Sequence, residues 1–288
     1  NVKHPTAKVK YITATKATKL GNLLNQHLPY HNSDAIISSG GVWQNQQRLL
    51  DGAIEIQKQA TIKVYISPTQ GYYYAFSEEL IIEETDEWVI VYKEPLITVA
   101  MDRSNQYYNL MAGLNKFYGH HDITNGVQPI TRLDYRVSGL TLFSKTKQAE
   151  RYLFKQMQQR RIKKRYQMVV DGLNFDPWYR VNNRLGSTYK AHASEDGKVA
   201  KTAFVKLEQT DDQTIFNVST QTGRRHQIRC HAAMVVSPIV NDELLYKEQP
   251  DYVVILAWHY WKPITKILRN NGLKSKIVIP LPEVRIIK

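Results

Sequence analysis

The stretch ITRLDYRVSGLTLFS, residues 130–144, joins a charged turn to a short strand. Its second half, GLTLFS, begins with a glycine and mixes Leu with Thr and Phe, which is typical of a β-strand. Its first half places one carboxylate, Asp134, between Arg132 and Arg136. A surface acid among arginines is usually an ion pair worth under about 1 kcal/mol, so that interpretation comes first.

More short strands of this kind occupy the later part of the chain, from Trp88 onward. They are WVIVY, RYQMVV, TAFVKL, TIFNVS and VVILAW. Two helices are predicted between them: KQAERYLFKQMQQ, after an N-cap at Thr146, and HQIRCHAAMV, with Ile228, Ala232 and Val235 on one face. Many strands with few helices and no regular βα alternation predict an α+β fold with a mixed, mainly antiparallel sheet.

The early part of the chain predicts a separate small unit. Residues 16–66 contain two helical patterns, around LGNLLNQHL and DAIISSGG, and two alternating strand patterns, AIEI and TIKVYI. We therefore expect an N-terminal segment at 1–15, a small α+β domain at 16–66, a linker at 67–85 and a larger domain at 86–288.

The charge balance indicates a polyanionic partner. The 288 residues carry 39 Lys and Arg against 26 Asp and Glu, a formal net charge of +13. Residues 1–85 hold 8 basic and 7 acidic residues, whereas 86–288 hold 31 and 19. The larger domain is therefore expected to meet the polyanion.

The cysteine count and the hydropathy pattern favour a cytoplasmic protein. Cys230 is the single cysteine, so no disulfide framework forms within a monomer, which fits a reducing compartment. The longest apolar runs, such as VVILAW, are too short to span a bilayer, and no cleavable signal pattern opens the chain.

The densest basic feature is residues 144–166, SKTKQAERYLFKQMQQRRIKKRY, with nine Lys or Arg and only Glu150 as an acid. A solvated helix face explains most charge runs of this length. Here the imbalance is too one-sided to be neutralised by pairs within the helix, and Tyr152, Phe154 and Tyr166 lie among the cations. Cations for phosphates with aromatics for unstacked bases predict RNA binding.

A second dense feature is TGRRHQIRCHAA, residues 222–233. Its His226, Cys230 and His231 suggest a metal site, but no second cysteine or paired-ligand motif completes the coordination. Cys230 is instead expected in the core. Arg225 and Arg229 are predicted one turn apart on one helix face, where a guanidinium can hold a carboxylate. Which carboxylate that is remains open from composition.

Other catalytic signatures are absent from the sequence. It contains no G-x-x-x-x-G-K-[ST] loop, no H-E-x-x-H and no G-x-S-x-G. An enzyme on this chain is therefore expected to work through Asp134 without a cofactor.

Three motifs resemble the RluA-type pseudouridine synthases. TRLDYRVSGLTLFSKT resembles the H-R-L-D-x-x-T-S-G-L motif around their catalytic aspartate, KKRYQMVVDG resembles their K-x-Y strand, and TGRRHQIRCHAA resembles their G-R-x-H-Q-I-R-x-H segment. GKVAKTAF, SPIVND and IPLPE resemble weaker family segments, so the likeness covers about 86–283. SSGGVWQNQQ and DGAIEI resemble the small RNA-binding domain named after ribosomal protein S four.

The resemblance implies a two-part antiparallel sheet with a central cleft, in which uridine in RNA becomes pseudouridine without metal or cofactor. Asp134 would be the nucleophile, at the ribose or the uracil ring, and Arg229 its ion-pair partner. Tyr166 would stack on the target base and accept the proton from carbon 5. The substrate-binding residues would be Arg132, filling the gap left by the flipped uridine, Ile228 as an apolar wall, and the cations Arg224, Arg225, Lys163, Lys164 and Arg165.

The sequence also departs from the family pattern. Thr131 replaces the usual His, Val137 replaces the usual Thr, YKEPLI at 92–97 is an altered N-K-P-x-G-L, and VVSPIVND at 235–242 lacks G-H-P and G-D. None of these changes removes Asp134. They indicate a divergent branch of the family, so the target RNA cannot be inferred from well-known members.

We thus predict a cytoplasmic, monomeric RNA pseudouridine synthase acting on ribosomal RNA in preference to transfer RNA. The main alternative is a non-catalytic RNA-binding protein on the same scaffold. A nucleic-acid hydrolase is a third hypothesis, but it requires a metal-binding carboxylate cluster that the sequence lacks.

Overall fold

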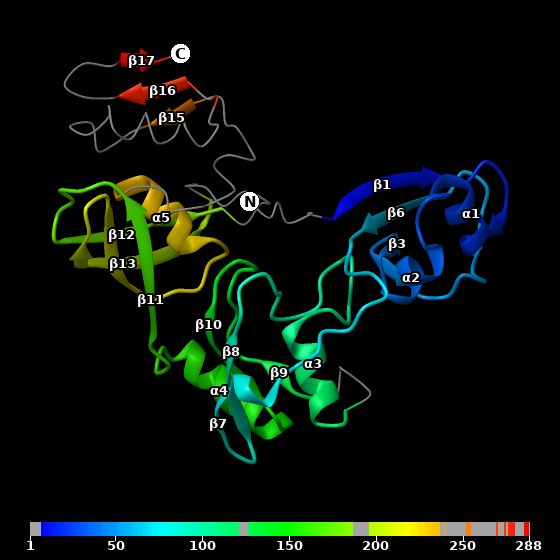
Figure 1. Cartoon of the computed structure of the whole chain (residues 1–288), viewed down its shortest axis with the longest axis horizontal. Helices are drawn as coiled ribbons and strands as arrows, with labels where there is room; N and C mark the ends of the chain where they lie inside the picture. Colours follow the sequence, from blue (N-terminus) through cyan, green and yellow to red (C-terminus); the bar gives the residue numbers. More distant parts are fainter. Residues whose placement is uncertain are drawn as a thin grey trace. The chain divides into compact units, whose positions relative to one another are not determined.

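The structure, a computed structural model, describes residues 7–120, 126–186, 196–236, 239, 252–254, 269, 274, 276–279 and 285–287 (Figure 1). The chain divides into two compact units, residues 1–158 and 159–288, and each is considered by itself. The predicted domain boundaries stay a prediction. Within the described residues, no helix is both long and apolar enough to cross a membrane.

The first unit begins with a small sheet packed on two helices. The sheet has the order β1-β6-β3-β4, and every neighbouring pair is antiparallel. Its strands are β1 (Lys8–Thr13), β6 (Thr61–Ile66), β3 (Val42–Gln44) and β4 (Gln47–Leu49). The helices are α1 (Leu20–His27) and α2 (Ser33–Ser38), and β2 (Thr18–Lys19) pairs with β5 (Glu55–Ile56). The predicted helices are confirmed, whereas β1 was not predicted, because it lies in the basic segment before the first helical pattern.

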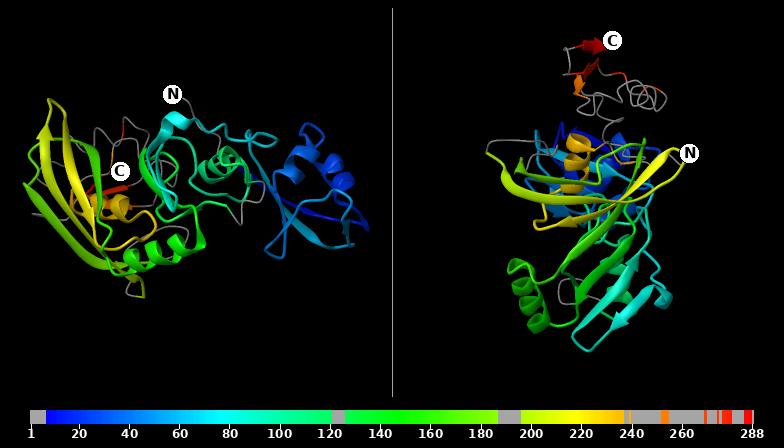
Figure 2. Two further views of the ribbon diagram at one scale, coloured as in Figure 1. Left: turned by 90° about the horizontal axis from the view of Figure 1, so that it is seen from below. Right: turned by 90° about the vertical axis from the view of Figure 1, so that its left-hand side faces the viewer.

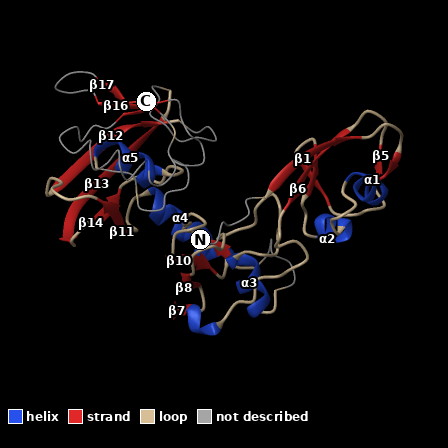
Figure 3. Cartoon of the chain, turned by 45° about the horizontal axis from the view of Figure 1, so that its top comes forward, coloured by secondary structure: helices blue, strands red, loops and turns tan. Residues whose placement is uncertain are grey.

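One face of this small sheet forms a core with the helices, which lie to one side of β1, β6 and β3 (Figures 1 and 3). The buried side chains are those that alternate inward along the strands together with the apolar stripe of each helix. They include Ile12, Leu20, Leu24, Ile36, Val42, Ile62 and Val64. The outward face of the sheet therefore carries a different set of residues.

The rest of the first unit is built on a second antiparallel sheet, β7-β8-β10-β9, with α4 alongside it (Figure 2). Its elements are the 3-10 turn η1 (Glu78–Leu80), β7 (Ile81–Glu84), β8 (Trp88–Lys93), α3 (Leu110–Phe117), β9 (Gln128–Pro129), β10 (Gly139–Ser144) and α4 (Lys147–Gln158). β7 falls in the segment predicted as a linker. The N-cap at Thr146 is confirmed, since its Oγ1 accepts from the amide of Ala149 at 3.1 Å.

Helix α3 was not predicted from the sequence. Gly113 stands in its middle, and an interior glycine weakens a helical pattern. Two features offset that cost. The side chain of Asn109 accepts from the amide of Ala112 at 2.9 Å, which caps the helix. Gly113 also lets Tyr74 approach closely, because a Cβ there would meet the Tyr74 carbonyl oxygen at 2.9 Å.

The second unit is a four-stranded antiparallel sheet of order β11-β14-β13-β12, covered on one face by α5 (Figure 1). The elements are β11 (Lys164–Asp171), β12 (Trp178–Leu185), β13 (Lys198–Gln209), β14 (Gln213–Thr220) and α5 (Gln227–Val235). Three further strands are β15 (Tyr252–Val254), parallel to β16 (Lys276–Ile279), and β17 (Arg285–Ile287), antiparallel to β16.

The α+β class with mainly antiparallel sheets is confirmed, because β15 and β16 form the one parallel pair among the described strands. Most of the SPIVND and IPLPE segments, and the end of VVILAW, lie outside the described residues.

Candidate active site

Asp134 lies in a loop between β9 and β10 of the first unit. The base of this loop is closed by the amides of Ile130 and Thr131, which donate to the carbonyl of Leu142 at 2.8 and 3.3 Å. Thr131, which stands where the family motif has His, also accepts from the amide of Leu142 through Oγ1 at 2.9 Å. The departure from the family motif therefore supplies a contact that closes the loop.

The tip of the loop is a tight turn. The amide of Val137 donates to the carbonyl of Asp134 at 3.0 Å. The turn leads into Gly139, whose φ of 135° favours glycine although a Cβ there would meet only ordinary contacts. Asp134 is half-buried, and Arg132 and Arg136 are exposed. The backbone thus fixes the position from which the Asp134 carboxylate projects.

A buried lysine ties this turn to the end of β8. Lys93 is fully buried, and its ammonium donates to the carbonyls of Glu94 at 2.9 Å, Ile97 at 2.8 Å and Tyr135 at 3.2 Å. Burial lowers the pKa of Lys93 to about 8, against the attraction of the Asp134 carboxylate, which raises it. Lys93 therefore places a positive charge near Asp134 and holds Tyr135, the residue after Asp134, through its backbone carbonyl.

The segment after Lys93 makes a second contact with the turn. The amide of Leu96 donates to the carbonyl of Tyr135 at 2.9 Å. Leu96 has a φ of 67°, in the left-handed region that favours glycine, and it stands where the N-K-P-x-G-L motif has glycine. The altered YKEPLI segment therefore adopts a glycine-favouring conformation without a glycine, and its Leu96 amide contacts the Asp134 turn.

Lys93 was not among the predicted site residues. The signal was present, because Lys93 is the one charged residue that ends the apolar strand WVIVYK. A lysine that completes such a strand is either at an exposed end or buried with its own partners. Sequence alone does not decide between these, and the three backbone carbonyls that decide it come from two separate segments.

Tyr166 and Ile228 are brought to the same core of the second unit. Both are half-buried and pack against the cluster that contains Met168, Val170 and Phe216. Because side chains alternate along β11, Tyr166 shares a face with Met168 and Val170, whereas Arg165 points to the opposite, exposed face. Tyr166 thus lies at the border of the core, where part of its ring reaches solvent.

The prediction that Arg225 and Arg229 lie on one face of a helix is wrong. Helix α5 begins only at Gln227, after His226, whose φ of 51° is left-handed. Arg225 therefore lies in the turn before the helix, while Arg229 is on the helix and half-buried. A pattern of i and i+4 cannot show where a helix starts, and here the buried Gln227 decides it.

Gln227 is a second residue that the sequence did not single out. Its side-chain oxygen accepts from the hydroxyl of Thr222 at 2.7 Å and the amide of Arg224 at 3.0 Å. Its side-chain nitrogen donates to the carbonyl of Lys201 at 3.0 Å and to Thr202 Oγ1 at 2.9 Å. Gln227 therefore fixes the loop that precedes α5 against β13.

His231 anchors the middle of α5 to the sheet. It is fully buried, with Nδ1 2.8 Å from Thr202 Oγ1 and Nε2 2.8 Å from Asn183 Oδ1, and burial lowers its pKa to about 4. Both ring nitrogens are thus used. The described residues contain no group of three potential metal ligands. Cys230 is half-exposed, so the expectation that it is a core residue is wrong.

The predicted substrate-binding cations differ in their surroundings. Lys163, Arg165 and Arg225 are exposed. Lys164 donates to the carbonyl of Thr222 at 3.4 Å, and Arg224 donates through Nε to the carbonyl of Val199 at 3.0 Å. Burial, followed by the nearby Arg224 charge, lowers the pKa of Lys164. These two cations therefore also hold the backbone around the motif.

The basic tract 144–166 is partly neutralised by acids. Lys145 forms an ion pair with Glu84 of β7 at 2.6 Å, and Lys147 pairs with Glu150 at 3.1 Å. Arg151 and Lys155 are exposed on α4, as are the rings of Tyr152 and Phe154. Exposed cations and aromatics on one short helix remain consistent with the predicted RNA contact.

The predicted site residues are therefore divided between the units. Arg132 and Asp134 belong to the first unit, and Tyr166, Arg229 and Ile228 belong to the second. The pairing of Asp134 with Arg229 stays a prediction.

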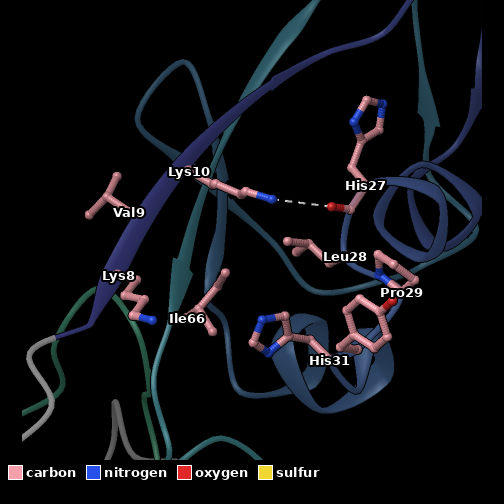
Figure 4. A pocket seen from close by; sticks show the side chains of 9 residues that line it. Lys8, Val9, Lys10, His27, Leu28, Pro29, His31 and Ile66 are labelled. Atoms are coloured by element: carbon pink, nitrogen blue, oxygen red, sulfur yellow. Dashed lines mark hydrogen bonds between the residues drawn. The ribbon is translucent and has the colours of Figure 1, made fainter.

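A pocket of about 520 Å³ lies away from these residues, beside the small N-terminal sheet of the first unit (Figure 4). It opens between β1 and the end of α1, where Lys10 donates to the carbonyl of His27 at 3.3 Å. Its lining consists of Lys8, Val9, Lys10, His27, Leu28, Pro29, Tyr30, His31 and Ile66. It contains none of the motif residues, so it is no part of the candidate active site.

Comparison with known proteins gives the family. The model of the RNA pseudouridylate synthase family matches residues 87–234, half of the chain. The dual-specificity RNA pseudouridine synthase RluA of Pasteurella multocida is 30% identical over 187 residues, which cover 62% of this chain and 80% of that protein. The chain therefore belongs to the RNA pseudouridylate synthase family, and the RluA-type resemblance of its motifs is confirmed.

Other matches are partial. Ribosomal large subunit pseudouridine synthase D of Nitrosomonas europaea is 30% identical over 180 residues, covering 59% of this chain and 51% of that protein. The chain spans 38% to 59% of the length of several curated relatives. Among solved structures, the protein titled "Human RNA Pseudouridylate Synthase Domain Containing 4" is 16% identical, with a TM-score of 0.50. The match covers 72% of this chain and 87% of that one, and it supports the fold.

A second family model overlaps the first. The C-methyltransferase C-terminal domain matches residues 212–282, of which 212–234 are shared with the synthase model. This second model covers a quarter of the chain, so it does not show that the chain belongs to the C-methyltransferases.

Proposed function

We propose that the protein isomerises uridine in RNA to pseudouridine, with Asp134 as the nucleophile. The observation that supports this most is the support of the Asp134 turn, within the region that matches the family. Its base is closed by Leu142, and its tip is held by Lys93 and Leu96. A nucleophile gains from such fixed geometry, because small displacements from the productive position cost large factors in rate.

The reaction is an internal rearrangement, so its atoms balance without a cofactor. The bond between uracil N1 and ribose C1′ breaks, and a bond between uracil C5 and C1′ forms. The proton on C5 is lost, and N1 ends with a proton. The chain therefore has to supply a nucleophile that departs again, a proton acceptor and a dry pocket. Asp134 fits the first of these roles, at the ribose or the uracil ring.

The other residues are assigned to supporting roles. Arg229 is assigned as the ion-pair partner that orients the Asp134 carboxylate. Tyr166, whose ring is partly open to solvent at the edge of its core, stacks on the target base and accepts the C5 proton. Ile228, packed on the same core, forms an apolar wall. Arg132, which is exposed, fills the stack after the uridine flips out.

RNA is the proposed partner, and ribosomal RNA is favoured over transfer RNA. The net charge of +13 supports a polyanion, and one relative is named for the large ribosomal subunit. We further propose that the protein acts as a monomer in the cytoplasm, where its half-exposed Cys230 stays reduced.

The test uses purified full-length protein with ribosomal and transfer RNA that lack modifications. Pseudouridines are mapped by chemical labelling and primer extension. The proposal predicts new pseudouridine at one or a few positions. Tight binding with no product on any cellular RNA would favour the alternative, a non-catalytic RNA-binding protein.

A further inference from the structure

The outward face of the small N-terminal sheet carries a row of aromatic and cationic side chains. Residues directly opposite each other on antiparallel strands lie on the same face. The register places Tyr11 of β1 opposite Lys63 of β6, Lys63 opposite Trp43 of β3, and Trp43 opposite Arg48 of β4. The row crosses all four strands, on the face opposite the buried core.

These side chains form an alternating ladder with two additions, Tyr65 of β6 and Arg103 of a loop that reaches this face. The Lys63 ammonium lies 5.2 Å from the Tyr11 ring centre and 5.1 Å from that of Tyr65. Arg103 donates to the Tyr65 hydroxyl at 3.1 Å. The guanidinium groups of Arg103 and Arg48 lie 5.8 and 4.7 Å from the Trp43 ring centre. We call these six residues the aromatic ladder.

One end of the aromatic ladder has a structural role, and the other end is open. Arg48 donates to Gln106 and to the carbonyl of Asp102, and the Trp43 indole donates to the carbonyl of Arg103. This end therefore holds the 102–106 loop. At the other end Tyr11 is 66% exposed, on β1, which is an edge strand of this sheet among the strands that the structure describes.

The aromatic ladder is positively charged. Hydrogen bonds to Tyr65 and Tyr11 raise the pKa of Lys63, so its ammonium stays charged. The Asp102 carboxylate, which attracts Arg48, is turned into its own loop, where it accepts from Ser104 and from the amide of Asn105. Besides the ladder, the adjacent row offers Val9, paired with Tyr65. The three cations of the ladder therefore suit a polyanion.

We propose that the aromatic ladder binds an unpaired segment of the RNA substrate, with a base stacked on Tyr11 and phosphates paired with Lys63 and Arg103. Cations that alternate with aromatic rings on an exposed sheet face suit unstacked bases and their backbone, whereas paired RNA hides its bases. This inference rests on the proposed function for the identity of the RNA as substrate.

The test measures binding of the full-length protein to two labelled RNAs by fluorescence anisotropy. One is a single-stranded oligouridine of about 12 nucleotides, within the usual site size of single-strand binders, and the other is a duplex of equal length. Tyr11→Leu keeps apolar bulk but loses the aromatic face, Tyr11→Phe keeps the face, and Lys63→Gln removes one charge. The matched controls are Tyr30→Leu, a 96% exposed tyrosine outside the ladder, and Lys58→Gln, an exposed lysine in a turn.

Tyr11→Leu is expected to weaken single-strand binding about tenfold and duplex binding little, while Tyr11→Phe binds as the wild type does. Lys63→Gln is expected to reduce the slope of log K against log salt by about 0.7 for the single strand. Unchanged affinity in Tyr11→Leu, or an equal loss in the controls, overturns the proposal. So does an equal loss on the duplex, or a change in self-association without a change in RNA binding.

Pseudouridine formation is measured on the same proteins, so that the two proposals fail separately. If the wild type makes pseudouridine while Tyr11→Leu binds RNA normally, the aromatic ladder proposal is wrong and the proposed function stands. If Tyr11→Leu loses single-strand binding but the wild type makes no pseudouridine, the ladder binds RNA and the proposed function is wrong.

Discussion

Replacing Lys93 by methionine tests how the Asp134 turn is held. Methionine keeps the length and apolar stem of lysine but donates no hydrogen bond. The carbonyls of Glu94 and Ile97 lose this donor, at about 1–3 kcal/mol each for a buried group left unpaired. The pKa of Lys93 is lowered from 10.5 to about 8, so about 3 kcal/mol is recovered when no charge is buried. The net loss of stability is therefore at most about 3 kcal/mol.

The substitution is expected to affect catalysis more than its small net loss of stability suggests. In Lys93→Met the carbonyl of Tyr135 still accepts a hydrogen bond from the Leu96 amide but loses the one from the Lys93 ammonium. The positive charge near Asp134 is also lost. We predict a fall in kcat of about 10- to 100-fold with little change in KM for RNA, because the turn is displaced while the RNA contacts remain.

Hydrogen exchange reports the loosening directly. The amides of Leu96 and Val137 close the contacts of the turn, so their peptides should lose protection in Lys93→Met, while those of β11 and β14 in the second unit should not. Lys58→Met, at an exposed position, serves as the control. Full protection at Leu96 and Val137 together with wild-type kcat would refute the role of Lys93 as a positioning residue.

Three further predictions concern titration and the support of α5. The pKa of Lys93 is about 8 in the folded protein and 10.5 in the unfolded chain, so the unfolded chain binds more protons between pH 8 and 10.5. The free energy of unfolding should therefore rise with pH over this range. Urea unfolding should show this rise in the wild type and not in Lys93→Met. His231, with a folded pKa of about 4 against 6.5, should make stability fall as pH drops from 6.5 toward 4, and His231→Leu should remove that dependence while costing about 1–3 kcal/mol of stability. Gln227→Ala should increase exchange in the peptide containing Thr222 and Arg224, whose side chain and amide it anchors; unchanged exchange there would count against that anchor.

The elements that follow simple periodicity were predictable. The short runs WVIVY, GLTLFS and TIFNVS, rich in β-branched and aromatic residues, became β8, β10 and β14, and the capped pattern after Thr146 became α4. Each pattern depends on residues that are neighbours in sequence, so the local signal is complete. The α+β class follows from counting such elements.

The features that depend on distant partners were not predictable. Helix α3 needs the close approach of Tyr74 to its interior Gly113, and β1 needs its pairing with β6. Arg225 was placed on a helix that in fact begins at Gln227, because the hydrogen bonds that fix that start come from Lys201 and Thr202. Lys93 was missed for the same reason, since its partner at Tyr135 is 42 residues away.

The candidate nucleophile came from motif recognition more than from physics. Composition left Asp134 as an ordinary acid between two arginines, and only its place in the L-D-Y-R-V-S-G-L segment singled it out. The structure adds a reason for its geometry, which is a turn closed at its base by Leu142 and held at its tip by the 93–97 segment.

The most direct measurement is pseudouridine formation by Asp134→Asn. Asparagine preserves the size of the side chain but is a much weaker nucleophile than a carboxylate. We therefore expect no detectable pseudouridine on an RNA that the wild type modifies, with an RNA affinity within a few-fold of the wild type. Asp34→Asn, at an exposed acid on α2, should retain full activity. Turnover by Asp134→Asn at a rate near that of the wild type would contradict the central claim.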